Sequence, residues 1–143
     1  MAHRLARTVV LATAILAVAA LPAAPKTTSN LSTTGASLTG INYAFDPWPC
    51  TSACVGGQWS AMDYSATVKD TNAGDGNDVF VHAKVDAYGY AAREYTSSAA
   101  RTRSISQSIV GGADPAQSGQ IQVCRDRGTL LPDNCAATPV LYR

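Results

Sequence analysis

Two stretches of the chain alternate largely between apolar and polar residues, and this period of two constrains the fold more than any other feature of the sequence. They are residues 62–69 (MDYSATVK) and 79–86 (VFVHAKVD). Because successive side chains of a β-strand point to opposite faces, each stretch predicts a strand with one buried and one solvent-facing side. The residues between them, DTNAGDGN (70–77), are turn formers, so we expect the two strands to form a hairpin.

Short segments of strand-forming composition continue through the rest of the chain. Gly, Pro, Asn and Asp separate them, and no amphipathic helical pattern of ten residues or more follows the first 24 residues. This organisation predicts an all-β fold, an antiparallel immunoglobulin-like β-sandwich of about six or seven strands. A small closed barrel is the alternative architecture. Besides the two alternating stretches, we expect strands at residues 38–45, 90–96, 102–110, 119–125 and 138–142.

The first residues have the pattern of an export signal. Arg4 and Arg7 precede an uncharged run at 8–21, which small residues and a proline follow. This pattern predicts a signal peptide over residues 1–24 that is cleaved between Ala19 and Ala24. The uncharged run is shorter than the roughly 20 residues that a membrane span needs, so we expect a secreted, extracellular protein with no membrane contact after cleavage.

Composition divides and limits the rest of the chain. Residues 25–39 are rich in Ser and Thr and poor in large apolar residues, which predicts a flexible leader. Residues 40–143 then form a single domain. The whole chain has 143 residues, with 11 basic against 10 acidic side chains. Such a balance excludes a disordered polyelectrolyte and argues against a nucleic-acid partner.

All four cysteines follow the predicted signal peptide. An even number of cysteines in a small exported chain predicts disulfides, because the destination is oxidising. Of the three possible pairings we favour the local one, Cys50 with Cys54 and Cys124 with Cys135. A zinc site would favour Cys-x2-Cys spacing, which these residues lack, and we expect no cofactor.

The 70–78 loop is the one candidate for a metal site. Its oxygen donors and glycines resemble the composition of a calcium loop. An EF-hand, however, places an oxygen ligand at the fifth position and a glutamate at the twelfth, where this chain has Gly74 and Val81. We therefore expect a structural turn, with a weak calcium site as the alternative. The calcium candidates are Asp70, Asn72, Asp75 and Asp78.

The sequence offers little for catalysis. His82 is the one histidine after the signal peptide, no Gly-x-Ser-x-Gly turn is present, and the cysteines are expected to be in disulfides. A hydrolase needs a nucleophile, a base and an orienting group together. We therefore expect no enzymatic activity and assign no catalytic residue.

Aromatic residues near predicted loops and strand ends favour a binding function. Exposed rings can stack on sugars or anchor a protein partner; packing in the core is the alternative role. We expect a non-enzymatic extracellular binding module for a glycan, a cell-wall polymer or a protein. A secreted inhibitor or antagonist of an extracellular enzyme is the second hypothesis, with loop 45–54 or 128–134 as the inhibitory segment. The ligand-binding candidates are Trp48, Tyr88, Tyr90 and Tyr95.

Several arginines are predicted to lie on neighbouring strands. They are Arg93, Arg101, Arg103, Arg125 and Arg127. Interspersed Ser and Thr favour a solvated strand face rather than a binding patch. Glu94, Asp126 and Asp133 are near enough in sequence to neutralise the arginines.

Three segments carry a family resemblance. DVFV (78–81), IQVCRDR (121–127) and PDNC (132–135) resemble small exported actinobacterial proteins of unknown function. In that family a late strand ends in a cysteine that pairs across a Pro-Asp loop. The resemblance spans residues 58–136. It implies a secreted β-sandwich with a C-terminal disulfide loop, and it implies no activity.

Overall fold

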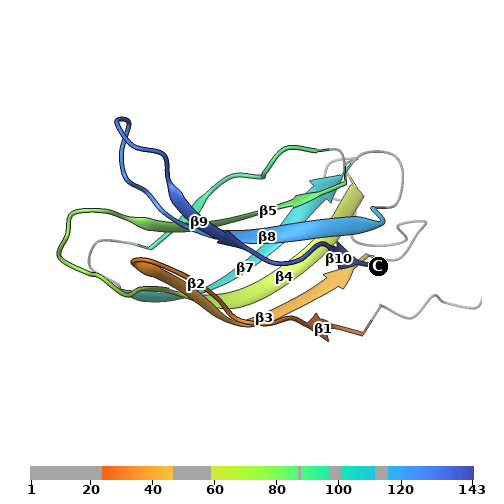
Figure 1. Cartoon of the computed structure of the whole chain (residues 1–143). Coiled ribbons are helices and arrows are strands. Elements are labelled where there is room, and N and C mark those ends of the chain that lie inside the picture. Colours follow the sequence, from red (N-terminus) through yellow and green to blue (C-terminus); the bar gives the residue numbers. More distant parts are fainter. Residues whose placement is uncertain (1–23, 47–58, 87, 97–100, 112–115) are drawn as a thin grey trace, which may run out of the picture.

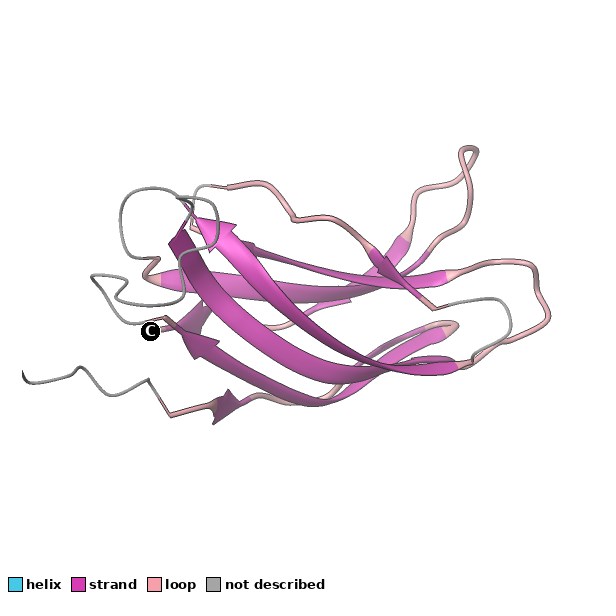
Figure 2. Cartoon of the chain, turned by 180° about the vertical axis from the view of Figure 1, so that it is seen from behind, coloured by secondary structure: helices cyan, strands magenta, loops and turns pink. Residues whose placement is uncertain are grey.

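All regular structure in the described part of the chain is β-strand. The computed structural model describes residues 24–46, 59–86, 88–96, 101–111 and 116–143. Two five-stranded antiparallel sheets pack face to face (Figures 1 and 2). The prediction of an all-β, two-sheet fold is confirmed. The predicted signal peptide (residues 1–23 of it), Trp48 and the Cys50 and Cys54 pair lie outside the described residues.

The first sheet contains the three longest strands among the described residues. Its strand order is β1-β3-β4-β7, and β2 pairs with β3 beyond the end of β1. Register shifts interrupt the β3–β4 pairing between Thr39 and Asn42 and the β4–β7 pairing between Ser60 and Met62. The strands are β1 (Lys26–Thr27), β2 (Leu31–Thr33), β3 (Ala36–Phe45), β4 (Trp59–Asp70) and β7 (Thr102–Gly111).

The second sheet is built around the β5–β8 pair. Its order is β10-β8-β5-β6, and β9 pairs with β8 on the same side as β10. The disulfide between Cys124 and Cys135 joins β8 to β9, with the two Cα atoms 4.1 Å apart, which confirms that predicted pair. The strands are β5 (Val79–Val85), β6 (Glu94–Tyr95), β8 (Ser118–Arg125), β9 (Asn134–Ala137) and β10 (Leu141–Tyr142).

The core lies between the sheets and follows the predicted alternation. Met62 and Val68 of β4 are fully buried, as are Val81 and Ile121 of the opposing sheet. At Gly119 the packing requires the absence of a side chain, because a Cβ atom there would lie 2.7 Å from the sulfur of Met62. The apolar faces thus meet closely at the beginning of β8.

The predicted hairpin of residues 62–69 and 79–86 is wrong. Strand β4 pairs with β3 and β7, whereas β5 pairs with β6 and β8. Residues 71–78 therefore carry the chain from one sheet to the other. Turn formers predict a reversal of the chain but do not determine which strands become hydrogen-bonded neighbours. Here the two apolar faces pack against each other across the core instead.

The expected flexible leader is also wrong for most of its length. Residues 26–27, 31–33 and 36–39 lie in strands that hydrogen-bond within the first sheet. Ala36 and Leu38 are fully buried. The Ser and Thr residues that suggested flexibility are also compatible with strands, since threonine favours β-structure and polar residues suit a solvent-facing side.

Two of the three side chains on the outer side of β5 are buried, contrary to the prediction that this side faces solvent. Phe80 is fully buried and His82 is only 9% exposed. The chain after β5 folds back along this strand, where Ala91 N–H donates to the carbonyl of Ala83 at 2.8 Å. This returning segment, residues 88–96, places its side chains over β5 and shields the face that the sequence pattern predicted to be exposed to solvent.

The described residues also bear on membrane crossing. Among them there is no helix with the length and hydropathy that a bilayer span requires.

Candidate functional site

The covered outer face of the second sheet contains a stack of rings. The ring of His82 lies parallel to that of Tyr90, with 4.1 Å between the centroids. Phe80 meets the edge of His82 at 5.2 Å, and the guanidinium of Arg93 lies 4.1 Å from the centroid of Phe80. Ring stacking and cation–π contacts of this kind hold segment 88–96 onto β5.

His82 is in its neutral form at neutral pH. Burial lowers the pKa of His82 below its ordinary value, and the hydrogen bond to Gln122 opposes this effect only in part. Nε2 of His82 lies 2.7 Å from Oε1 of Gln122 on the neighbouring strand β8. His82 is thus a packed structural residue, not the exposed surface histidine that the alternation predicted.

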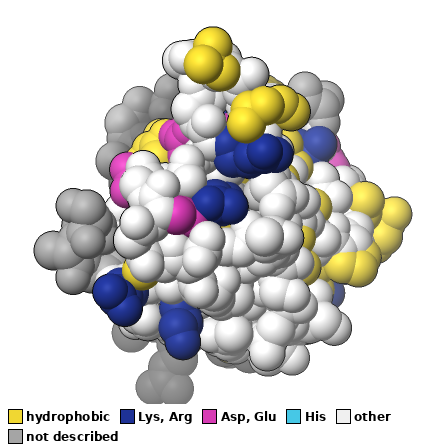
Figure 3. Space-filling model, turned by 60° about the vertical axis from the view of Figure 1, so that its left-hand side comes forward, with side chains coloured by type: hydrophobic (Ala, Val, Ile, Leu, Met, Phe, Trp, Pro, Cys, Tyr) yellow, Lys and Arg dark blue, Asp and Glu magenta, His cyan; other side chains and the backbone are white. Residues whose placement is uncertain are grey.

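Ion pairs neutralise most of the arginines that the sequence suggested as a patch. Arg93 pairs with Asp133 at 3.3 Å and with Asp126 at 3.8 Å. Arg103 pairs with Glu94 at 3.1 Å. Figure 3 shows Lys and Arg side chains beside Asp and Glu side chains on this face of the molecule. The expectation that nearby acids offset the arginines is confirmed for these two residues.

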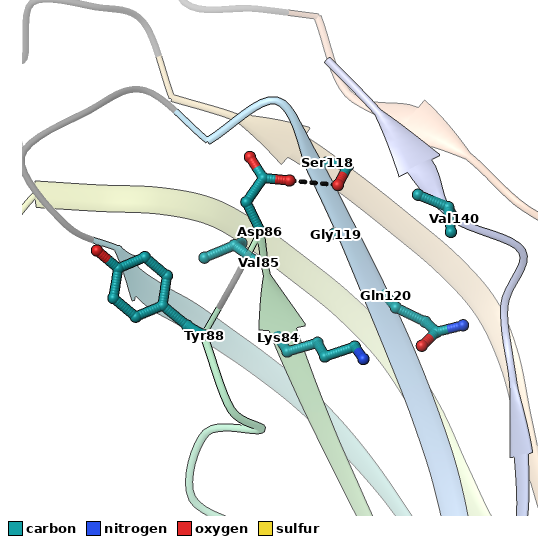
Figure 4. A pocket seen from close by; sticks show the side chains of 8 residues that line it. All are labelled: Lys84, Val85, Asp86, Tyr88, Ser118, Gly119, Gln120 and Val140. Carbon is teal, nitrogen blue, oxygen red and sulfur yellow. Dashed lines mark hydrogen bonds between the residues drawn. The ribbon is translucent and has the colours of Figure 1, made fainter.

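A pocket opens where β5 ends and β8 begins. It has a volume of about 410 Å³ (Figure 4), and its lining residue Lys84 contacts the Tyr90 ring of the stack. Tyr88 and Val140 stand on opposite sides of it, and Lys84 and Asp86 lie between them. The lining residues are Lys84, Val85, Asp86, Tyr88, Ser118, Gly119, Gln120 and Val140. The pocket therefore combines an exposed ring, an apolar wall and charged groups of both signs.

Asp86 is fixed at one side of this pocket. Its carboxylate accepts hydrogen bonds from the hydroxyl of Ser118 and from the backbone N–H of Gln117. Burial opposes ionisation, but these hydrogen bonds outweigh it and hold the pKa of Asp86 below its ordinary value. Asp86 is consequently an oriented carboxylate that accepts, and does not donate, hydrogen bonds at neutral pH.

Lys84 supplies the opposite charge. Its ammonium group lies 4.9 Å from the centroid of the Tyr90 ring. No carboxylate among the described residues pairs with it. Its hydrogen-bond donors are therefore available to a ligand in the pocket.

Gln120 is held in place by two partners. Its Oε1 accepts from the hydroxyl of Tyr90 at 3.1 Å, and its Nε2 donates to the carbonyl of Thr138 at 2.9 Å. Burial raises the pKa of Tyr90, so its hydroxyl remains a donor across the physiological range. Tyr90 thus belongs to the support of the pocket and not to its surface.

The structure separates the predicted ligand-binding tyrosines into two groups. Tyr88 is 52% exposed and lines the pocket, and Tyr90 orients Gln120 behind it. Tyr95 lies elsewhere, with its ring 5.4 Å from Phe80 and its hydroxyl 3.3 Å from Arg93. Sequence reasoning missed the polar lining residues, because they are common residue types whose strands become neighbours only in the folded chain.

Three of the four calcium candidates, Asp70, Asn72 and Asp75, take part in hydrogen bonds within the loop. Oδ1 of Asp70 accepts from the N–H of Asn72, and Oδ1 of Asp75 accepts from the N–H of Asn77, both at 2.9 Å. Asp75 also forms an ion pair with Arg125. The hydrogen bond from the Asn77 N–H is the main cause that lowers the pKa of Asp75. These contacts are those of a structural turn, in which the Asp75 carboxylate already has a cationic partner.

A metal site requires an arrangement of several ligating side chains. Within the ranges that the structure describes, no group of three or more His, Cys, Asp or Glu side chains is arranged to hold a metal ion.

Comparison with known proteins identifies no relative of this chain. The chain matches no protein-family model, no curated protein and no solved structure. The resemblance to small exported actinobacterial proteins stays a prediction from the sequence.

Proposed function

We propose that this protein is a secreted, non-enzymatic glycan-binding module whose ligand occupies the pocket between Tyr88 and Val140. The observation that carries the proposal is the exposed ring of Tyr88 beside polar groups that are already oriented. A sugar presents an apolar C–H face and a rim of hydroxyl groups. Its face would stack on Tyr88, and its hydroxyls would meet Lys84 and Asp86.

Preorganisation favours binding at this site. Hydrogen bonds already fix the side chains of Asp86 and Gln120, so a ligand that meets them loses little side-chain entropy. The free ammonium group of Lys84 is the most adaptable donor in the pocket. This combination of one mobile and two fixed polar groups suits a ligand with several hydroxyls.

The same geometry favours binding over hydrolysis. A glycosidase places two carboxyl groups on either side of the scissile bond, and one of them has a raised pKa so that it can act as the acid. Among the described residues, the pocket lining contains one carboxylate, Asp86, and its pKa is lowered. Asp86 is therefore suited to accept a hydrogen bond from a sugar and unsuited to protonate a leaving group.

Export and topology are part of the proposal. The signal pattern at residues 1–24 would direct the chain out of the cell, and the Cys124–Cys135 disulfide is compatible with an oxidising destination. We assign the two-sheet fold to the immunoglobulin-like class of sandwiches.

Retention on insoluble polysaccharides tests the proposal. The full exported chain should bind at least one of chitin, cellulose, xylan and peptidoglycan, and Tyr88→Ala should weaken that binding about tenfold, or about 1.4 kcal/mol. Tyr142→Ala is the matched control, because Tyr142 is 66% exposed and does not line the pocket. The proposal fails if none of the polymers retains the protein, or if Tyr88→Ala and Tyr142→Ala bind the polymer equally well.

The inhibitor hypothesis has one supporting observation. Loop 128–134 is closed at its base by the Cys124–Cys135 disulfide and is therefore held in shape. Thr129 and Leu130 form a turn. A peptide that binds by adding a strand to the edge of an enzyme's sheet is extended, so this loop does not fit that mode of inhibition. We place this function second for that reason; loop 45–54 lies mostly outside the described residues.

A further inference from the structure

The loop between β8 and β9 projects beyond the sheets (Figure 1). Three contacts fix its base. The disulfide joins Cys124 to Cys135, Oδ1 of Asp126 accepts from the N–H of Gly128 at 2.9 Å, and Oδ1 of Asp133 accepts from the N–H of Arg127 at 3.3 Å. The loop therefore holds its tip at a set position relative to the second sheet.

The tip of this loop is apolar. Residues 128–132 (GTLLP) carry no charge, and they form the tip named here. Leu130 is 93% exposed and Leu131 is 52% exposed. Figure 3 shows hydrophobic side chains gathered at the top of the molecule, next to Lys and Arg side chains. Two adjacent leucines are exposed to water at the end of a fixed projection. An apolar surface of this kind is a candidate for contact with a binding partner.

The charges around the tip differ in whether they are paired. Arg93 forms ion pairs with Asp126 and Asp133 at the base of the loop. Arg127, directly before the tip, is exposed and has no carboxylate partner among the described residues. An unpaired cation beside an apolar tip is complementary to a surface with an anionic outer layer and an apolar interior.

We propose that the tip inserts Leu130 and Leu131 into the interfacial layer of an anionic lipid bilayer, where Arg127 meets lipid phosphates. The tip is convex, and Thr129 is the one residue of it with a polar side chain. A protein partner normally surrounds an apolar anchor with polar contacts at a shaped rim. A fluid bilayer accepts an apolar projection without such a match. This lipid contact differs from the sequence-based expectation of no membrane contact.

The expected binding is weak and reversible. Burial of two leucine side chains removes less hydrocarbon from water than a single myristoyl chain, whose binding is itself marginal, with an association constant on the order of 10⁴ M⁻¹. The contribution of Arg127 is therefore needed, and it decreases as salt screens the surface charge. We expect retention on anionic vesicles at low ionic strength and its loss at high ionic strength.

Vesicle co-sedimentation of the full exported chain tests this inference. The protein should sediment with vesicles of phosphatidylcholine mixed with phosphatidylglycerol and much less with phosphatidylcholine alone. The double variant L130D/L131D should lose about tenfold or more of the binding, and Arg127→Gln should lose about fivefold, since one basic residue contributes about 1 kcal/mol near an anionic surface. Tyr142→Asp is the control, because Tyr142 is also an exposed large hydrophobic residue, 66% exposed, and lies outside both the tip and the pocket lining.

The variants are expected to fold. Leu130 is almost fully exposed, so its replacement removes little packing, and the circular dichroism melting curve should not shift. The inference is overturned if the wild type binds neither vesicle or if L130D/L131D sediments like the wild type. It is also overturned if Leu130 and Leu131 instead mediate a stoichiometric complex with a protein, including a second copy of this chain. Retention on polysaccharide should be unaffected by L130D/L131D, so this test is independent of the proposed glycan site.

Discussion

The outer faces of the two sheets are built in opposite ways. On the first sheet, Ser65 and Thr67 of β4 lie beside Ser106 and Ser104 of β7, and these short side chains face outward. On the second sheet, the outward side of β5 carries Phe80 and His82, which segment 88–96 covers. A face of short hydroxyl side chains needs no cover, whereas a face with buried rings does.

This difference between the two faces shows which side of the molecule carries the candidate binding surfaces. The covering segment both shields β5 and begins at the pocket, with Tyr88 in the pocket wall and Tyr90 behind it. The same segment reaches the base of the projecting loop through Arg93 and its ion pairs with Asp126 and Asp133. Both proposed binding surfaces therefore depend on the covered face, and neither depends on the hydroxyl face.

The largest expected effect comes from removing the central ring of the covered face. Phe80→Ala should lower the free energy of unfolding by about 3–5 kcal/mol, because Phe80 is fully buried and its loss leaves a cavity. Ser106→Ala on the hydroxyl face should change it by less than about 0.5 kcal/mol. Urea unfolding followed by circular dichroism measures both. Similar values for the two variants would show that the faces do not differ in the way described.

A smaller effect is expected from the support of the pocket. Tyr90→Phe keeps the ring on His82 but removes the hydroxyl that donates to Gln120. The protein should lose about 1 kcal/mol of unfolding free energy, and its retention on polysaccharide should fall several-fold because Gln120 keeps only its hydrogen bond to Thr138. Tyr142→Phe, on an exposed tyrosine outside the pocket, is the control. Unchanged retention by Tyr90→Phe would assign Gln120 no role in binding.

The smallest effect is a dependence of stability on pH. The pKa of His82 is lower in the folded chain than its ordinary value of 6.5, so the unfolded chain binds the proton more tightly. The stability that this difference provides is complete above pH 6.5 and is lost as the pH falls through the folded-state pKa. Melting temperatures measured from pH 7 to about 5 should decline more steeply for the wild type than for His82→Gln. Parallel curves would contradict the burial of a neutral histidine at this position.

The sequence predicted local structure better than it predicted partners. The alternation at residues 62–69 correctly identified Met62 and Val68 as core residues. It could not show that β4 and β5 belong to different sheets, because pairing depends on contacts between strands distant in the chain. It also failed on the outer side of β5, where cover comes from residues 88–96, a segment whose own alternation is weak.

The same distinction applies to the candidate sites. The Cys124–Cys135 pair was predictable because the two residues are close in sequence and flank turn formers. Tyr88 was singled out as an aromatic residue beside a predicted turn, and the structure places it in the pocket wall. Ser118, Gln120 and Val140 carried no signal, since they become neighbours of Tyr88 only when β8 pairs with β5 and the C-terminal segment lies beside it.

Strand β8 connects the two ends of this arrangement. Ser118, its first residue, lines the pocket, and Arg125, its last, is followed directly by the projecting loop. An eight-residue strand is roughly 26 Å long. A rigid spacer of that length would keep a bound saccharide a few nanometres from any bilayer that the leucines touch. The protein would then hold a polymer and a lipid surface at a fixed distance, which the number of residues in one strand determines.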